Sequence, residues 1–249
     1  MVERIFFVNI EFNSEGRDRM NQKSVISTTA PWFVESRLGT INDEDIALIH
    51  KYGERLVYPK GAYILFDGDL VDAFMYIDSG MARCFVSNDE GLEKTVYRTD
   101  MFVAIECFMH EQPIHYNCVA EEDTIIYRVD REYKELLMGR SRIRDMIVDA
   151  LALKCRVLGW QVADLSLSKP LQRVARILYC WYFDEHADID RPLLHQDIAD
   201  MTGLHRVTVT NYINDLRKMG IIEQTKHKSW IVKDQEALRE LAFAGEMPE

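Results

Sequence analysis

The chain has 249 residues, of which 47% are hydrophobic, and its 41 acidic and 30 basic residues give a formal net charge of −11. Its length and composition predict a soluble globular protein of about two domains. The acidic balance argues against a protein that coats nucleic acid generally, and no apolar run is long enough to span a bilayer.

The five cysteines are scattered, without a C-x-x-C pair, at the positions Cys84, Cys107, Cys118, Cys155 and Cys180. The apolar run Ile5–Ile10 is closely flanked by charged residues and is too short for the hydrophobic region of a signal peptide. We therefore expect reduced thiols and a cytoplasmic protein. Residues 1–30, with a polar stretch at 13–27, are predicted to be a flexible N-terminal segment.

Residues 31–139 are predicted to form an antiparallel β-roll with a helical lead-in over Pro31–Leu38 and Asp43–Tyr52. From Arg55 onward, short β-rich runs alternate with turns rich in Gly, Asn and Asp, which predicts about eight strands over residues 55–130. The runs are Leu56–Tyr58, Ala62–Phe66, Phe74–Ile77, Met81–Val86, Thr95–Tyr97 and Thr124–Val129.

A roll of this kind could also house the metal of a cupin-like enzyme. His110 and His115 are five residues apart, but there is no His-x-His followed by a glutamate. Because close-set ligands on adjacent strand positions are what such a metal needs, we expect no metal, no cofactor and no catalytic residues. The metal enzyme with an appended helical domain remains the alternative from another functional class.

Residues 140–168 are predicted to be one long helix with two apolar stripes. One stripe suffices to cover the roll, so the other is expected to pair two subunits as in a coiled coil. A helix buried inside a monomer is the alternative. Lys154 interrupts the first stripe, so it either reaches solvent or faces a polar or anionic group. The expected dimer contacts are Ile147, Leu151, Leu158, Val162 and Leu165, and the second stripe is Met146, Ala150, Leu153 and Val157.

Pro170 marks a domain boundary, because proline cannot continue a helix but suits the first turn of a new one. Residues 169–249 then contain a helix over Leu171–Phe183 and, at Leu194–Leu216, a helix-turn-helix with its turn at Gly203. Ile221–Ile222 and Trp230–Val232 predict a hairpin, the wing of a winged helix, before a short C-terminal helix.

This module is locally basic, with six Lys or Arg against two acids between Gly203 and Lys233. We expect its second helix, about His205–Lys218, to enter a major groove, with the wing tip reaching phosphates. A protein-interaction module is the alternative. The expected DNA contacts are His195, Gln196, His205, Arg206, Val207, Thr208, Thr210, Asn211, Lys226 and Lys228.

The order of roll, long helix and winged helix resembles the CRP/FNR family of bacterial transcription regulators. The local motifs agree: Tyr76–Gly80, Asp89–Gly91, Gln196–Ala199 and Gly203–Val209, with Gly61 and Gly68–Asp69. The resemblance covers roughly residues 40–235. It implies a homodimer that binds a small effector in the roll and a palindromic double-stranded DNA site, with RNA polymerase as a candidate further partner.

Two departures bear on the effector. Cyclic-AMP receptors of the family carry Gly-Glu and an arginine for the cyclic phosphate, whereas this chain has Ile105-Glu106 and then Pro113–Asn117 without an arginine. A cyclic phosphate would lose its charge-assisted partner, so cAMP is not expected. Cysteines are absent before Cys84, so the N-terminal iron–sulfur cluster of the FNR type has no ligands.

A third departure lies in the second helix of the helix-turn-helix, about His205–Lys218. Many family members have an acid where this chain has Val207 and an arginine where it has Asn211. Valine can contact a thymine methyl and asparagine can pair with adenine, which predicts A·T-rich half-sites. The His-x-Val-Thr-Val pattern at His205–Val209 is also similar to that of the halorespiration regulators, which sense chlorinated aromatic acids.

We therefore expect a small organic acid, with aromatic acids included, as effector, with its ring against tyrosines and its anion against Lys154. A packed roll interior and a thiol-redox response through Cys118 and Cys155 are the alternatives. The expected effector-binding residues are Tyr97, Ile105, Glu106, His115, Tyr116, Cys118 and Lys154.

Overall fold

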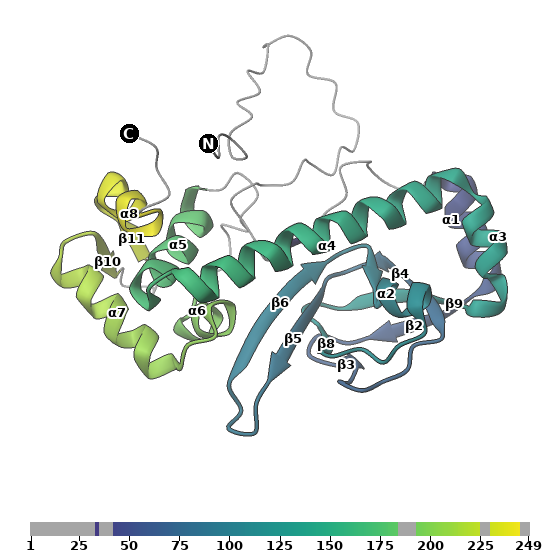
Figure 1. The fold of residues 1–249 in the computed structure, drawn as a ribbon, viewed down its shortest axis with the longest axis horizontal. Helices are drawn as coiled ribbons and strands as arrows, with labels where there is room; N and C mark the ends of the chain where they lie inside the picture. The colour runs from purple at the N-terminus through teal and green to yellow at the C-terminus, as the bar shows by residue number, and fades with distance from the viewer. Residues whose placement is uncertain (1–32, 35–41, 184–192, 225–229, 245–249) are drawn as a thin grey trace, which may run out of the picture.

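The computed structural model describes residues 33–34, 42–183, 193–224 and 230–244. The predicted flexible segment 1–30 and the wing-tip residues Lys226 and Lys228 lie outside them. A β-roll and a smaller helical domain are joined by the long helix α4 (Ser141–Leu167), which runs along the roll and ends at the helical domain (Figure 1). Within the described residues, no helix is long and apolar enough to cross a membrane.

Two sheets face each other in the roll, which confirms the predicted fold class. Turns rich in glycine and Asn/Asp separate short strands of apolar and β-branched residues, and such strands close into a roll when one face of each is buried. One sheet has the order β2 (Gly53–Tyr58), β9 (Thr124–Asp130), β4 (Ala73–Ser79), β7 (Phe102–Val103). The other has the order β1 (Phe33–Val34), β6 (Glu93–Thr99), β5 (Ala82–Ser87), β8 (Asn117–Ala120), β3 (Tyr63–Leu65).

The predicted lead-in is half right. Helix α1 (Asp43–Tyr52) forms, with Asn42 accepting the backbone N–H of Asp45 as its N-cap. Helix over Pro31–Leu38 is wrong where the structure describes it, because Phe33 and Val34 form strand β1, parallel to β6. Aromatic and β-branched residues favour an extended chain when a strand edge is available to them.

Three short helical segments, α2 (Ile105–His110), η1 (Arg131–Tyr133) and α3 (Lys134–Gly139), were not predicted. Each is shorter than two turns, too short for a helical hydrophobic period to be recognised in the sequence. They matter because α2 presents a charged side chain to the interior of the roll.

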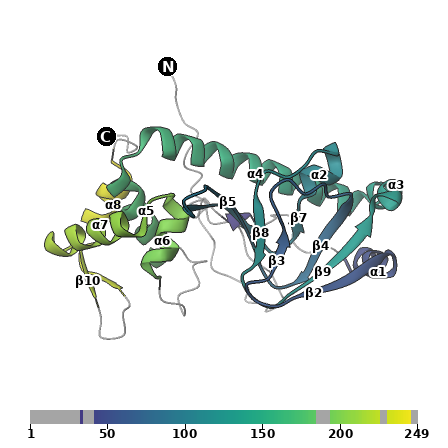
Figure 2. The same ribbon diagram turned by 90° about the horizontal axis from the view of Figure 1, so that it is seen from below.

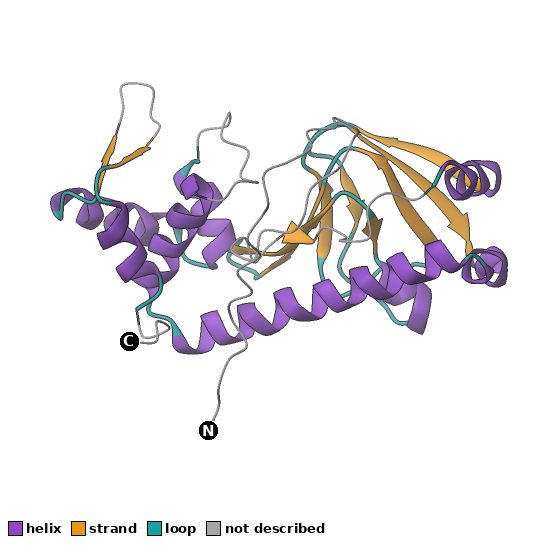
Figure 3. Cartoon of the chain, turned by 90° about the horizontal axis from the view of Figure 1, so that it is seen from above, coloured by secondary structure: helices purple, strands orange, loops and turns teal. Residues whose placement is uncertain are grey.

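Helix α4 covers the roll along most of its length (Figure 3). Leu153 and Val157 enter the core between the sheets, and Met146, Ile147 and Ala150 enter a second core with α1, α2 and α3. Ile147, expected at a subunit interface, is therefore only 1% exposed and packs inside its own chain. Leu151 of the same expected dimer stripe is half-buried against this core, whereas the stripe's C-terminal residues are exposed: Leu158 43%, Val162 65% and Leu165 47%.

The C-terminal domain is a winged helix. It contains α5 (Pro170–Phe183), α6 (His195–Thr202), α7 (Arg206–Lys218), a hairpin of β10 (Ile222–Gln224) and β11 (Trp230–Val232), and α8 (Gln235–Ala242). Gly203, at φ 67°, makes the turn between α6 and α7, a left-handed conformation that glycine adopts without steric cost.

A buried arginine ties this domain to the end of α4. The Arg176 side chain is 2% exposed, forms an ion pair with Asp164 of α4, and donates from Nε to the Ala242 carbonyl at 3.0 Å. A buried guanidinium needs such partners to offset its loss of hydration. It fixes α4, α5 and α8 together at the hinge near Ser168 (Figure 2).

Candidate functional sites

Four polar side chains from different parts of the chain meet inside the roll. Lys154 of α4 donates to Glu106 of α2 at 2.7 Å and to the Tyr97 hydroxyl of β6 at 2.8 Å. Tyr97 donates to the Tyr116 hydroxyl at 2.8 Å, and Tyr116 donates to the second carboxylate oxygen of Glu106 at 2.5 Å. These four groups, the charged cluster, form a closed ring of hydrogen bonds.

The backbone before α2 aims Glu106 into this ring. Ala104, the residue before the helix, adopts φ 51° and ψ 35°, an uncommon left-handed conformation for a residue with a Cβ. It turns the chain sharply from β7 into α2, so that Glu106 in the first turn reaches Lys154. Non-glycine residues in this region concentrate at functional sites.

Charge balance inside the cluster depends on one ion pair. The Lys154 side chain is 7% exposed and that of Glu106 is 36% exposed. Burial alone would raise the pKa of Glu106, but the Lys154 charge and the hydrogen bonds from Lys154 and Tyr116 outweigh it, so this pKa lies below its ordinary value. Burial first, and neighbouring Cys84 next, raise the pKa of Tyr97 and of Tyr116 far above that of a free phenol.

Two thiols line the roll beside the cluster. Cys84 of β5 and Cys118 of β8 are opposite each other in the sheet, and their sulfurs are 3.5 Å apart. The hydrogen bond with Cys84, followed by burial, raises the pKa of Cys118 well above its ordinary value. Cys118 is therefore a neutral thiol in an apolar wall, and buried protonated thiols react slowly. Cys155 is exposed on α4.

The structure brings together four of the predicted effector-binding residues: Tyr97, Glu106, Tyr116 and Lys154. Cys118 lies in the neighbouring wall, and Ile105 packs in the separate core with α1 and α3. His115 lies apart from the cluster, because its side chain is 88% exposed with Nδ1 4.0 Å from Asp67. Sequence reasoning missed the pairing of Lys154 with Glu106, since these residues are 48 positions apart.

A second candidate site is the exposed end of α7. His205 is its N-cap, and Arg206, Val207 and Asn211 are exposed on its first turns, with Val207 72% exposed. Thr208 is half-buried, and Gln196 of α6 is exposed and donates to Asp200 at 2.7 Å. Free polar side chains at a helix N-terminus are suited to phosphates and base edges.

Two residues predicted to contact DNA, His195 and Thr210, contact each other inside the domain. His195 Nδ1 is 2.9 Å from the Thr210 hydroxyl, and its ring stacks on Trp230 with centroids 5.4 Å apart. Burial, then the charge of Arg206, lowers the pKa of His195. These contacts fix α6 against α7 and the wing. His195 and Thr210 therefore stabilise the position of α7 through their contact with each other.

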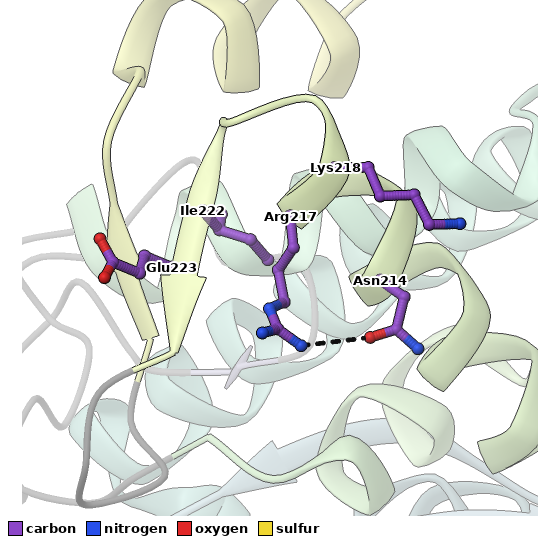
Figure 4. Close-up of a pocket in the computed structure, with 5 residues that line it drawn as sticks. All are labelled: Asn214, Arg217, Lys218, Ile222 and Glu223. Carbon is purple, nitrogen blue, oxygen red and sulfur yellow. Dashed lines mark hydrogen bonds between the residues drawn. The ribbon is translucent and has the colours of Figure 1, made fainter.

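The far end of α7 carries polar residues that the predicted contacts omitted. A pocket of about 490 Å³ between α7 and β10 is lined by Asn214, Arg217, Lys218, Ile222 and Glu223. Figure 4 shows Arg217 and Asn214 side by side, with 3.4 Å between guanidinium and amide oxygen. The local excess of Lys and Arg in this part of the sequence could have pointed to Arg217 and Lys218 as further DNA contacts.

Across residues 33–34, 42–183, 193–224 and 230–244, no three His, Cys, Asp or Glu side chains gather as a metal site requires.

Both halves of the chain match known protein families. Residues 55–141 match the cyclic nucleotide-binding domain, and residues 172–241 match the Crp-like helix-turn-helix domain. The chain belongs to the Crp/FNR family of transcription regulators. It is thus a DNA-binding transcription regulator with a ligand-binding domain.

Individual relatives agree with this assignment. The cyclic AMP receptor protein of Thermus thermophilus is 26% identical over 204 residues, which cover 80% of this chain and 93% of that protein. The c-di-GMP responsive global regulator CLP of Xanthomonas campestris has a TM-score of 0.67 at 16% identity and covers 77% of this chain and 99% of its own. A crp/fnr-family regulator from Eubacterium rectale has a TM-score of 0.63 at 20% identity, with coverages of 81% and 95%. The two structural similarities show the fold alone.

Proposed function

We propose that this Crp/FNR regulator acts as a homodimer whose roll binds a small organic acid at the charged cluster, and that α4 transmits binding to the winged helix. The supporting observation is the position of Lys154. It is a cation of the connecting helix itself, buried inside the ligand-binding domain. A ligand that changes the partner of Lys154 therefore acts directly on α4.

The exposure of the two ion-pair partners favours an anionic effector. Lys154 is held inside, whereas Glu106 is more than one-third exposed and can turn toward solvent. An entering carboxylate that replaces Glu106 leaves the buried charge balanced, while a neutral ligand that breaks the pair leaves Lys154 uncompensated. Tyr97 and Tyr116, both protonated, would pack against an aromatic ring and donate to the acid.

A thermal-shift screen tests the effector class. Benzoate-type acids, the corresponding amides and cAMP are compared on the full chain and on Lys154→Met. At about one hundred times its Kd a ligand adds about 2.7 kcal/mol, so we expect an acid to raise the melting midpoint by roughly 5–10 °C. The amides and the Lys154→Met chain should show no such rise. A rise with cAMP alone would contradict the proposal.

For DNA, we propose that the exposed end of α7 lies in the major groove, with A·T-rich half-sites read by Val207 and Asn211. Val207 presents methyl groups where a thymine methyl could pack, and the Asn211 amide suits adenine. Arg206 and Arg217, at opposite ends of α7, would contact phosphates and set the register. Both arginines are exposed.

A gel-shift titration tests this assignment, using palindromic sites with half-sites about 10 base pairs apart. Arg206→Ala should weaken binding about equally across DNA sequences and reduce the slope of its salt dependence by about one, because it removes a phosphate contact. Arg128→Ala, on a roll strand far from α7, is the matched control and should bind as the unaltered chain does. If Arg206→Ala left both affinity and salt dependence unchanged, the winged helix would be better assigned to a protein partner.

For the dimer, we propose that the exposed stripe of α4 pairs with that of a second subunit. Its residues recur in alternating steps of three and four, the spacing of a coiled-coil seam. Val148 is 61% exposed, Val162 65% exposed and Cys155 exposed. The seam is Val148, Leu151, Cys155, Leu158, Val162 and Leu165, of which Leu151 is half-buried against the core of its own chain.

Light scattering on the eluting protein tests this seam. Val162→Glu should convert the dimer to a monomer, because two carboxylates would face each other across the two-fold axis. Ala163→Glu, also exposed but beside the seam, is the control and should remain dimeric. A Val162→Glu chain that stays fully dimeric at micromolar concentration would refute the assignment.

A further inference from the structure

A short stretch of β6 contacts three functional parts of the molecule. Lys94 contacts the helix-turn-helix, the Val96 carbonyl accepts a hydrogen bond from Gln161 of α4, and Tyr97 belongs to the charged cluster. Residues in a strand rise about 3.3 Å each, so Lys94 and Tyr97 are roughly 10 Å apart. The strand lies beside α6 of the C-terminal domain (Figure 1).

Lys94 joins the roll to the end of α6. Its ammonium donates to the Met201 carbonyl at 2.6 Å and to its neighbour's carbonyl, that of Thr95, at 3.1 Å. The carbonyls at a helix C-terminus lack partners within the helix and attract a cation. Burial lowers the pKa of Lys94 to about 8, while the charge of Asp164 opposes this shift.

The fit between the two domains is close at this point. A Cβ built on Gly203 would lie 3.1 Å from Cδ and 3.7 Å from Cβ of Lys94. Arg173 of α5 donates to the adjacent Thr202 carbonyl at 3.0 Å, so two cations bind successive carbonyls at the end of α6. The exposed face of α7 is not covered by these contacts, so they hold the helix-turn-helix without blocking it.

We propose that β6 is a direct link between the charged cluster and the helix-turn-helix, in addition to the route through α4. A ligand that breaks the hydrogen bond between Lys154 and Tyr97 frees the Tyr97 end of the strand. The hydrogen bond from Lys94 to α6, at the other end of the strand, is then weakened. The coupling rests on the proposed effector site, whereas the contact between Lys94 and α6 does not.

Cross-linking tests the contact. The pair Lys94→Cys and Gly203→Cys has a Cβ separation of 3.7 Å, within the range of disulfides. Because a cysteine at residue 203 must adopt a positive φ, circular dichroism first checks that the double variant is folded. Under mild oxidation the double variant should lose two hydrogens in one intact chain, seen by mass spectrometry and reversed by a reductant. The two single variants are the controls. A folded double variant in which residues 94 and 203 stay unlinked would overturn the contact.

Amine labelling tests the coupling without altering the interface. With sulfo-N-hydroxysuccinimidyl acetate, Lys94 should react at least ten times more slowly than exposed Lys60 of the same chain, because burial against Met201 outweighs the larger neutral fraction that its lowered pKa gives. Tyr97→Phe, which removes the hydroxyl that Lys154 binds, should speed labelling of Lys94 at least threefold. Tyr76→Phe, on the opposite sheet, is the matched control and should leave the rate unchanged.

Amine labelling tests the contact of Lys94 with α6 and its coupling to the charged cluster separately. If Lys94 and Lys60 react equally in the unaltered chain, the contact with α6 is refuted. If Lys94 is protected but its rate is unchanged in both Tyr97→Phe and Lys154→Met, the link is refuted and the contact stands. Neither result bears on whether the roll binds an acid, which the thermal-shift screen decides separately.

Discussion

The arrangement of the roll around α4 depends on the ion pair between Lys154 and Glu106. An ammonium in an apolar interior is costly unless an opposite charge and hydrogen bonds compensate it, and breaking a fully buried pair typically costs about 3–5 kcal/mol. Here Glu106 is partly exposed, so the cost of breaking the pair is smaller. A buried cation with a partly exposed partner is what the proposed binding of an acid would require.

Helix α4 carries three surfaces that a single apolar stripe could not provide. One face packs on the roll through residues such as Leu153, one exposes the proposed seam around Val162, and Lys154 supplies the charge. The buried Arg176 then ties the end of this helix to the winged helix. Because a ligand shifts only an equilibrium between states to which it binds differently, a change at Lys154 has to alter one of these packed contacts.

Much of this architecture could be predicted from the sequence. Turn residues at regular spacing indicated the roll, Pro170 indicated the hinge, and Gly203 between two amphipathic segments indicated the helix-turn-helix. Pairings distant in sequence could not be predicted, among them Lys154 with Glu106 and Lys94 with Met201, because periodicity carries no information on which elements meet. His115 illustrates the limit: it is a neighbour of Tyr116, but its side chain points to solvent.

The most direct measurement is the titration of Glu106 by carbon-13 NMR of its side-chain carboxyl, assigned from the resonance lost in Glu106→Gln. We predict that the pKa of Glu106 lies below the roughly 4.3 of a free glutamate and rises markedly in Lys154→Met. Because the folded pKa is depressed, the stability from the pair is present above the unfolded pKa and lost as pH falls through the folded one. A Glu106 that titrates at or above its ordinary value in the unaltered chain would contradict the ion pair at the centre of the roll.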